Sequence, residues 1–329
     1  MPEFVILGWT RWRFLAAAKS WGALTADRVD SKLLRFLVRV YKSRKLNRIC
    51  KPPFIGIWDR IYFDTSKISP DDEVYFIVYE GFAFSYSRNY LEHLRKKYRK
   101  CKIILFYLNS AVGPGSYLED NWRPVKDCYD AGMTINRADA ERLGMLFCDF
   151  WPHLLPDKTP QPENSCDVFF AGADKGRLDT ILAVYERLAD AGLKLDFWIT
   201  GVPADRQKHA DAIHYTDAIT IDWLNYDEIL QRDANAKCIL EIDPFGQNYA
   251  TLRTYEAVRY RKKLLTTNQE APGRWFYNAK TVQVFSEASE IDTDFITRPL
   301  SPEDEHEAFD GIDVGDFGRF ADWVIRNVP

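Results

Sequence analysis

The sequence predicts an α/β protein with two doubly wound domains, each built around a mainly parallel β-sheet. Short apolar runs typical of buried strands alternate along the chain with longer amphipathic stretches typical of helices. A polar, proline-rich segment at 153–165, HLLPDKTPQPENS, interrupts this alternation near the middle of the chain. The length of 329 residues also agrees with about two domains.

The first half of the chain contains the elements of one such domain. Strands are predicted at 3–8, 74–79, 103–108, 133–136 and 145–150. Helices are predicted at 28–48, 87–100 and 137–143, and residues 120–129 are predicted to be partly helical. Gly144 is suited to end the helix at 137–143. We assign residues 1–152 to an N-terminal Rossmann-like domain and residues 153–165 to a linker.

The second half repeats the pattern. Strands are predicted at 167–172, 195–200, 238–242, 264–267 and 282–285. Helices are predicted to begin near Leu178, near Asn225 and at Thr251, with Gly192 ending the first of them. Residues 166–316 form the predicted C-terminal Rossmann-like domain, and residues 317–329 form a terminal helix.

Composition excludes several classes of protein. The net charge of −4 gives no indication of nucleic-acid binding. The six cysteines are scattered without CxxC spacing, which favours reduced cysteines in a cytoplasmic protein. There is no run of 18 apolar residues and no signal-peptide pattern, so no membrane-spanning helix is predicted. The five histidines form no metal-binding pattern, and no metal or cofactor is predicted.

The charge is unevenly distributed along the chain. Residues 1–53 contain 12 Lys and Arg against 3 Asp and Glu, whereas the rest contains 32 against 45. The predicted helix 28–48 is amphipathic, with an apolar stripe that includes Leu33, Phe36 and Val40. Two interpretations remain open. The helix packs on its own domain with a solvated basic face, or this face lies against an anionic membrane surface.

The stretch 238–268 is the most informative of the chain. It reads as a strand, a polar turn containing Pro244, Gly246 and Asn248, a helix from Thr251, and a second strand. The exposed N–H groups and partial positive charge of a helix N-terminus suit a phosphate. Arg253 and Glu256 lie on one face of this helix, where the arginine could bind a diphosphate and the glutamate a ribose. The alternative is an ordinary surface ion pair.

A second phosphate-binding candidate is the loop 172–177, GADKGR, which follows a predicted strand and precedes a helix. It matches neither the Walker P-loop nor the GxGxxG pattern, and a tight strand-to-helix turn is its alternative interpretation. Lys175 and Arg177 would offset diphosphate charge there.

The amino-acid sequences of both loops resemble those of a known family. Gly246–Gln247, Thr251–Arg253, Glu256–Ala257 and 262–268 are similar to the nucleotide-sugar site of GT-B glycosyltransferases, and closest to a bacterial polysaccharide-synthesis branch. The resemblance implies two domains facing across a cleft, with the terminal helix returning toward the first. The donor-binding residues it implies are Gly172, Asp174, Lys175, Gly176, Arg177, Tyr226, Gly246, Gln247, Asn248, Thr251, Leu252, Arg253 and Glu256.

The implied reaction transfers a sugar from a nucleotide-sugar donor, a UDP-sugar above all, to a hydroxyl of a surface polysaccharide or lipid-linked glycan. It needs no metal, because fixed cations can stabilise the leaving diphosphate. Asp59 and Glu80 are the candidate catalytic bases of an inverting enzyme. Many retaining members carry a glutamate where this chain has Asn248, so the stereochemistry stays open.

The sequence bears on two other classes of protein. The missing glutamate leaves open a degenerate GT-B module that binds a glycan or a partner without catalysis. The absence of a GxGxxG motif argues against an epimerase or dehydrogenase. The D-x-D motif at Asp292–Asp294 is interpreted as a solvated acidic loop rather than a Mg²⁺ site.

Overall fold

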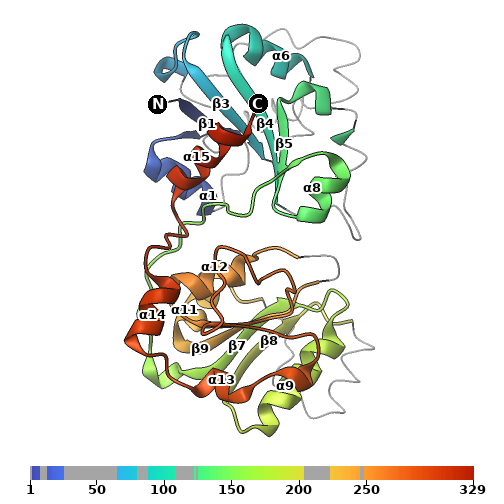
Figure 1. Ribbon diagram of the computed structural model, residues 1–329, viewed down its shortest axis with the longest axis vertical. Coiled ribbons are helices and arrows are strands. Elements are labelled where there is room, and N and C mark those ends of the chain that lie inside the picture. The colour runs from blue at the N-terminus through green and yellow to red at the C-terminus, as the bar shows by residue number, and fades with distance from the viewer. Residues whose placement is uncertain are drawn as a thin grey trace. The chain divides into compact units, whose positions relative to one another are not determined.

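The computed structural model describes residues 2–7, 13–25, 65–79, 88–108, 122–123, 125–203, 223–244 and 248–329. The chain forms two compact units (Figure 1), one from Met1–Leu154 with Gly315–Pro329 and one from Leu155–Val314. Each unit contains one parallel β-sheet with helices on both faces. The predicted α/β class, with two doubly wound domains, is confirmed.

The sheet of the first unit has the strand order β2-β1-β3-β4-β5-β6, and every pairing is parallel. The order is typical of doubly wound folds, because it changes direction around the first strand. The strands are β1 (Glu3–Leu7), β2 (Leu24–Thr25), β3 (Glu73–Tyr79), β4 (Lys100–Tyr107), β5 (Ala131–Thr134) and β6 (Leu146–Phe147).

Helices cover both faces of this first sheet. They are α1 (Arg13–Trp21), α6 (Arg88–Lys97), α8 (Arg137–Leu143) and α15 (Phe317–Asn327). Tyr90 and Leu94 of α6 pack with Phe76 on one face. On the other face, Phe4 of β1 contacts Phe317 of α15, with ring centroids 5.8 Å apart. The C-terminal helix therefore completes the core of the N-terminal unit.

Several elements of the first unit differ from the sequence prediction. Helix α1 and strand β2 were not predicted, and β5 lies two residues before the strand predicted at 133–136. Helix α6 ends at Lys97, because Lys100 already pairs with Glu73 in the sheet. The predicted strand 145–150 is limited to β6, since Phe150 leaves the sheet and packs against the guanidinium of Arg319. Within the predicted partial helix 120–129, a single 3₁₀ turn, Lys126–Cys128, is formed by the described residues.

The second sheet has the order β11-β10-β9-β7-β8 and is also parallel throughout. Its central strands at 236–241 and 263–266 are mostly buried, as expected for a sheet covered by helices on both sides, whereas its edge strands are only partly buried. The strands are β7 (Cys166–Ala173), β8 (Leu195–Thr200), β9 (Ala236–Glu241), β10 (Lys263–Thr266) and β11 (Val282–Val284).

Helices cover the two faces of this second sheet as well. They are α9 (Leu178–Asp190), α11 (Tyr226–Asn235), α12 (Leu252–Arg259), α13 (Thr293–Thr297) and α14 (Pro302–Phe309). Helices α9 and α13 lie on one face and α11 and α12 on the other (Figure 1). Asn225 begins α11 with a capping box formed with Glu228, as its position in the sequence predicts.

Candidate functional site

The carboxyl edge of the second sheet collects the polar loops that the sequence singles out. Because all five strands are parallel, the segments that follow β7 and β9 leave the sheet at the same edge. In open α/β sheets this is the edge at which ligands bind. The loop 174–177 leads from β7 into α9, and residues 242–251 lead from β9 into α12.

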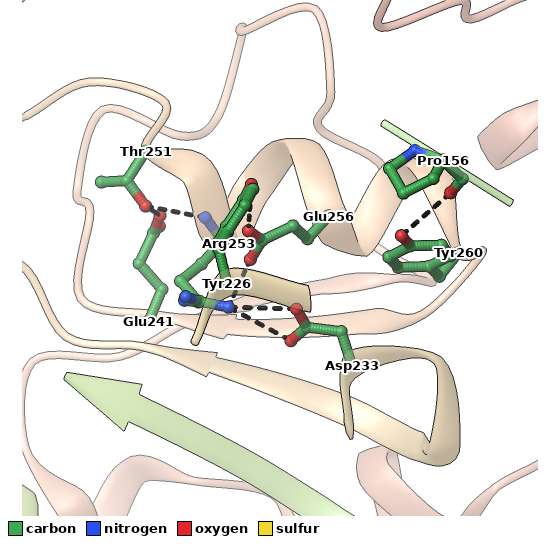
Figure 2. A network of polar contacts seen from close by, with 8 residues as sticks. All are labelled: Pro156, Tyr226, Asp233, Glu241, Thr251, Arg253, Glu256 and Tyr260. Carbon is green, nitrogen blue, oxygen red and sulfur yellow. Dashed lines mark hydrogen bonds and ion pairs between the residues drawn. The ribbon is translucent and has the colours of Figure 1, made fainter. Parts of the chain in front are cut away.

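Glu241, the last residue of β9, ties the start of α12 to the sheet. Its carboxylate accepts hydrogen bonds from the hydroxyls of three threonines, with O–O distances of 2.9 Å to Thr254 and 2.6 Å to Thr266. The third donor is Thr251 (Figure 2), which also caps the helix by accepting from the backbone N–H of Arg253 at 3.1 Å. The predicted N-terminus of α12 is thereby held rigidly at the sheet edge.

Arg253 and Glu256 do not form a surface ion pair. Both are drawn into a buried network with Asp233 of α11 and Tyr226, the first residue of that helix (Figure 2). Nη1 of Arg253 donates to Glu256 and lies 3.0 Å from an oxygen of Asp233, and the hydroxyl of Tyr226 donates to Glu256 at 2.8 Å. The side chains of Asp233 and Glu256 are fully buried, and that of Arg253 is 15% exposed.

In this network one guanidinium faces two buried carboxyl groups, and the pKa values of both carboxyl groups are raised. Burial and then repulsion by Glu256 raise the pKa of Asp233 well above its usual range. Burial also raises the pKa of Glu256, although Arg253 opposes this effect. For Arg253, burial lowers the pKa, but the two carboxylates outweigh it and the net pKa is raised. Arg253 is therefore a permanent cation held by its neighbours.

The other side of the Arg253 guanidinium is unoccupied among the described residues. Its three polar contacts all use Nη1, which leaves Nε and Nη2 without a hydrogen-bond partner in the described part of the chain. Two parallel N–H donors of a guanidinium match two oxygens of a phosphate. The arrangement is suited to an anion on that side.

In the loop after β7, Asp174 is buried and makes hydrogen bonds within the protein, whereas Lys175 is exposed. Asp174 is buried, and its Oδ1 accepts from the N–H groups of Gly176 at 3.1 Å and Leu178 at 2.9 Å. This carboxylate already occupies the N-terminus of α9, so a phosphate would have to meet other groups of the loop. Lys175 is exposed and has a positive φ of 44°, which turns the chain sharply before Gly176.

Arg177 folds back over the end of β7. Its Nε and Nη2 donate to the carbonyl oxygen of Ala173 at 3.2 and 3.1 Å. A side-chain carbon at Gly172 would lie 2.7 Å from Nη2 of Arg177, so the glycine makes room for the guanidinium. Burial lowers the pKa of Arg177, while Asp243 and Glu241 act in the opposite direction and Arg253 adds to the lowering. The structure thus brings the two predicted phosphate-binding arginines within electrostatic range of each other.

The remaining predicted site residues have other positions. Asn248 is exposed and its carbonyl oxygen accepts from Arg274 at 3.3 Å, and Leu252 begins α12. Gly246 and Gln247 lie outside the described residues. So do both predicted catalytic bases, Asp59 and Glu80, and the basic segment 28–48.

Sequence reasoning did not single out Asp233, Glu241 or Asp243, which the structure places in or beside this site. A signal for them exists in the sequence. Glu241 ends the apolar strand β9, and Asp243 follows two residues later. Asp233 lies three residues after the buried Leu230 on the inner stripe of α11, where an acidic residue is unusual.

Two further observations concern metals and membranes. Within the described ranges, no group of three His, Cys, Asp or Glu side chains is placed to hold a metal ion. The D-x-D segment is the start of the short helix α13 and not the predicted loop, because Asp292 caps this helix by accepting from the N–H of Asp294. Among the described helices, none combines the length and the apolar character needed to cross a membrane.

No protein-family model and no curated protein sequence matches this chain. Its fold is similar to several solved structures that, by their descriptions, are glycosyltransferases or belong to glycosylation-associated complexes. One is a chain of the Glycosylation Associate Protein (Gap123) complex from Streptococcus agalactiae, with 14% identity and a TM-score of 0.46. The match covers 80% of this chain but 55% of that one, so this chain spans about half the length of the Gap123 chain.

Two other similar structures are matched over more of their length. An α-glucosyltransferase in complex with UDP-glucose and DNA containing an abasic site has 10% identity and a TM-score of 0.47, with 96% of this chain and 92% of that chain covered. An α,α-trehalose-phosphate synthase (UDP-forming) from Burkholderia vietnamiensis has 14% identity and a TM-score of 0.42, with coverage of 94% and 80%.

Proposed function

We propose that this protein is a glycosyltransferase that takes a sugar from a nucleoside-diphosphate sugar, a UDP-sugar in the first place, and transfers it to a hydroxyl of a surface polysaccharide or lipid-linked glycan. The observation that carries the proposal is the pair of arginines at one sheet edge. Arg253 presents Nε and Nη2 without a partner among the described residues, and it is close enough to Arg177 to help lower the pKa of that residue. Glu256 lies beside Arg253, as a ribose-binding carboxylate would.

In this proposal the chain's own cations do the work that a metal does in other transferases. Charge builds up on the diphosphate as the bond to the sugar breaks, and preorganised cations stabilise it. Arg253 is fixed by Asp233 and Glu256, and Arg177 by the carbonyl of Ala173, so neither has to reorganise during the reaction. We therefore propose a reaction that requires no metal, and turnover should be unchanged by EDTA.

Lys175 provides a direct test of the diphosphate assignment. It is exposed, so replacing it with glutamine should leave the fold intact. A hydrogen bond between charged groups contributes about 1.5–3 kcal/mol, so Lys175→Gln should weaken UDP about tenfold or more and leave uridine unchanged. Titration calorimetry of both ligands measures this difference.

Lys194→Gln is the matched control, because Lys194 is also exposed but lies just before β8, at the opposite edge of the same sheet. It should change neither affinity. Equal weakening of UDP and uridine by Lys175→Gln would show that this lysine does not contact the phosphates. Failure of the wild-type protein to bind UDP or any UDP-sugar would reject the proposed function itself.

The burial of Glu256 favours a second candidate function, a GT-B-like module that binds a glycan or a partner without catalysis. One oxygen of Glu256 is occupied by the Tyr226 hydroxyl and the other by Arg253, so a ribose would have to displace the tyrosine. Release of UDP from UDP-sugars, with and without an acceptor extract, separates the two functions. A transferase releases UDP faster with acceptor, whereas a binding module releases none in either case.

The basic segment 28–48 supports a proposal about where the enzyme acts. Residues 1–53 carry 12 Lys and Arg against 3 Asp and Glu, which suits a peripheral position on an anionic membrane that contains a lipid-linked acceptor. The protein should sediment with anionic but not neutral vesicles, and salt should release it. Replacing Arg35, Arg39 and Lys42 with Glu should abolish sedimentation and preserve UDP binding. Equal sedimentation with both vesicle types would contradict the proposal.

A further inference from the structure

Asp243 is a buried carboxyl group that the described structure leaves unused. It lies two residues beyond β9, at the carboxyl edge of the second sheet, and its backbone N–H donates to the hydroxyl of Thr267 at 2.8 Å. The residue as a whole is only half-buried, yet both carboxylate oxygens are shielded from solvent. Neither oxygen has a hydrogen-bond partner among the described residues.

Glu241, two residues earlier, shows what a structural carboxylate looks like at this edge. Both of its oxygens accept hydrogen bonds within the protein, from Thr251, Thr254 and Thr266. Asp243 has no comparable donors. Burial and then Glu241 raise its pKa well above the usual range, and Arg177 opposes this without forming a hydrogen bond to it. A buried polar group without partners is destabilising, so its presence calls for an explanation outside the folded chain.

The ends of the neighbouring strands also have buried polar groups that lack a hydrogen-bond partner among the described residues. The hydroxyl of Thr200, which ends β8, and the amide nitrogen of Asn268, two residues after β10, are also buried without a hydrogen-bond partner in the described part of the chain. Gln283 is the other described residue of this unit with such a group. Unsatisfied polar groups therefore gather at the edge where Arg177 and Arg253 lie, as expected for a site that a polar ligand completes.

The carboxyl group of Asp243 suits the sugar of a nucleoside-diphosphate sugar better than its phosphates. A carboxylate repels phosphate oxygens, which have Arg177, Arg253 and Lys175 as cationic partners. Its two oxygens match two neighbouring hydroxyls of a pyranose ring, each of which donates one hydrogen bond. We propose that Asp243 accepts hydrogen bonds from two hydroxyl groups of the transferred sugar, and so makes the site prefer a UDP-hexose over UDP. The inference rests on the proposed function, since it presupposes a nucleotide-sugar donor.

The test compares UDP with UDP-glucose, UDP-galactose and UDP-N-acetylglucosamine by titration calorimetry on the wild-type protein, Asp243→Asn and Asp243→Ala, all in EDTA. The wild type should bind at least one UDP-sugar tenfold or more tightly than UDP. Asp243→Ala should remove this preference while UDP affinity stays within twofold. Asp243→Asn should bind no UDP-sugar as tightly as the wild type does.

The melting temperature of the free protein gives a second readout that distinguishes a ligand-binding role from a structural one. Asp243→Asn should raise it, because an unsatisfied buried carboxyl is replaced by a group that cannot ionise. Asp167→Asn is the matched control. Asp167 lies near the amino end of β7 and pairs with Lys237 at 2.8 Å, so its loss should not raise stability or affect any nucleotide.

Several outcomes would overturn the assignment of Asp243 to the sugar. One is equal weakening of UDP and UDP-sugars by Asp243→Ala, which would place the residue at the phosphates. Others are a lower melting temperature of Asp243→Asn and a wild-type protein that binds UDP but prefers none of the three UDP-sugars. These results leave the proposed function intact, whereas a wild type that binds neither UDP nor a UDP-sugar rejects both.

Discussion

Replacing Arg253 with leucine should lower the free energy of unfolding by about 3–5 kcal/mol at pH 8, because it leaves the buried carboxylates of Asp233 and Glu256 without their cation. The loss should shrink as the pH falls toward 5. Both carboxyl groups already have raised pKa values, so the folded protein binds protons that the unfolded chain releases. Removing Arg253 strengthens this effect, and stability then decreases more steeply as the pH rises.

Urea unfolding of wild type and Arg253→Leu at pH 5 and pH 8 measures the effect. Arg259→Leu is the matched control on the same helix, because Arg259 pairs with Asp157, whose side chain is 96% exposed. A surface pair of this kind contributes at most about 1 kcal/mol. If Arg253→Leu were no more destabilising than Arg259→Leu, the network in Figure 2 would not be a buried, charge-compensated one.

Glu241→Ala should destabilise the protein by roughly 3 kcal/mol, since three threonine hydroxyls lose their acceptor in a buried position. The effect should be concentrated at the start of α12, which Thr251 and Thr254 attach to β9 through this carboxylate. Hydrogen exchange should therefore show faster exchange in α12, and urea unfolding should show the lower free energy of unfolding. Nucleotide binding should weaken as a secondary consequence, because Arg253 lies in the first turn of that helix.

Two variants control for this prediction. Glu241→Gln keeps the volume and one acceptor oxygen, so it should lose less stability than alanine. Glu228→Ala removes an exposed carboxylate that also holds a helix start, and the loss of such a cap costs about 1 kcal/mol. A Glu241→Ala protein as stable as Glu228→Ala would refute the role of Glu241 as the attachment of α12 to the sheet.

The three carboxylates that the sequence did not single out thus differ in kind. Glu241 has all its hydrogen bonds inside the protein and stabilises the site, whereas Asp243 has none among the described residues. Asp233 is a third case, since it fixes Arg253 from the side opposite to its unpaired donors. A rigid arginine with one side held by buried carboxylates is preorganised for an anion, which is the property expected of a diphosphate site.

Local sequence signals located most strands and several helices of the two units, but not α1, β2, α13 or α14. Apolar runs located the strands β1, β3, β4, β7, β8 and β9 to within a few residues, because strands covered by helices on both faces must be apolar throughout. Gly144, with a φ of 64°, and the capping residues Asn225 and Thr251 end or begin their helices as predicted. These features depend on the residue itself and on its immediate neighbours, so they can be read from one sequence.

The charge state and accessibility of the site were decided by the tertiary structure. Spacing of three residues placed Arg253 and Glu256 on one helix face, but the position of Asp233 on α11 determines that both are buried. The contact between α11 and α12 joins residues twenty positions apart, and no local pattern reports it. The free oxygens of Asp243 likewise follow from which hydroxyls the neighbouring strands place within reach, since a hydrogen bond requires a particular distance and direction in space.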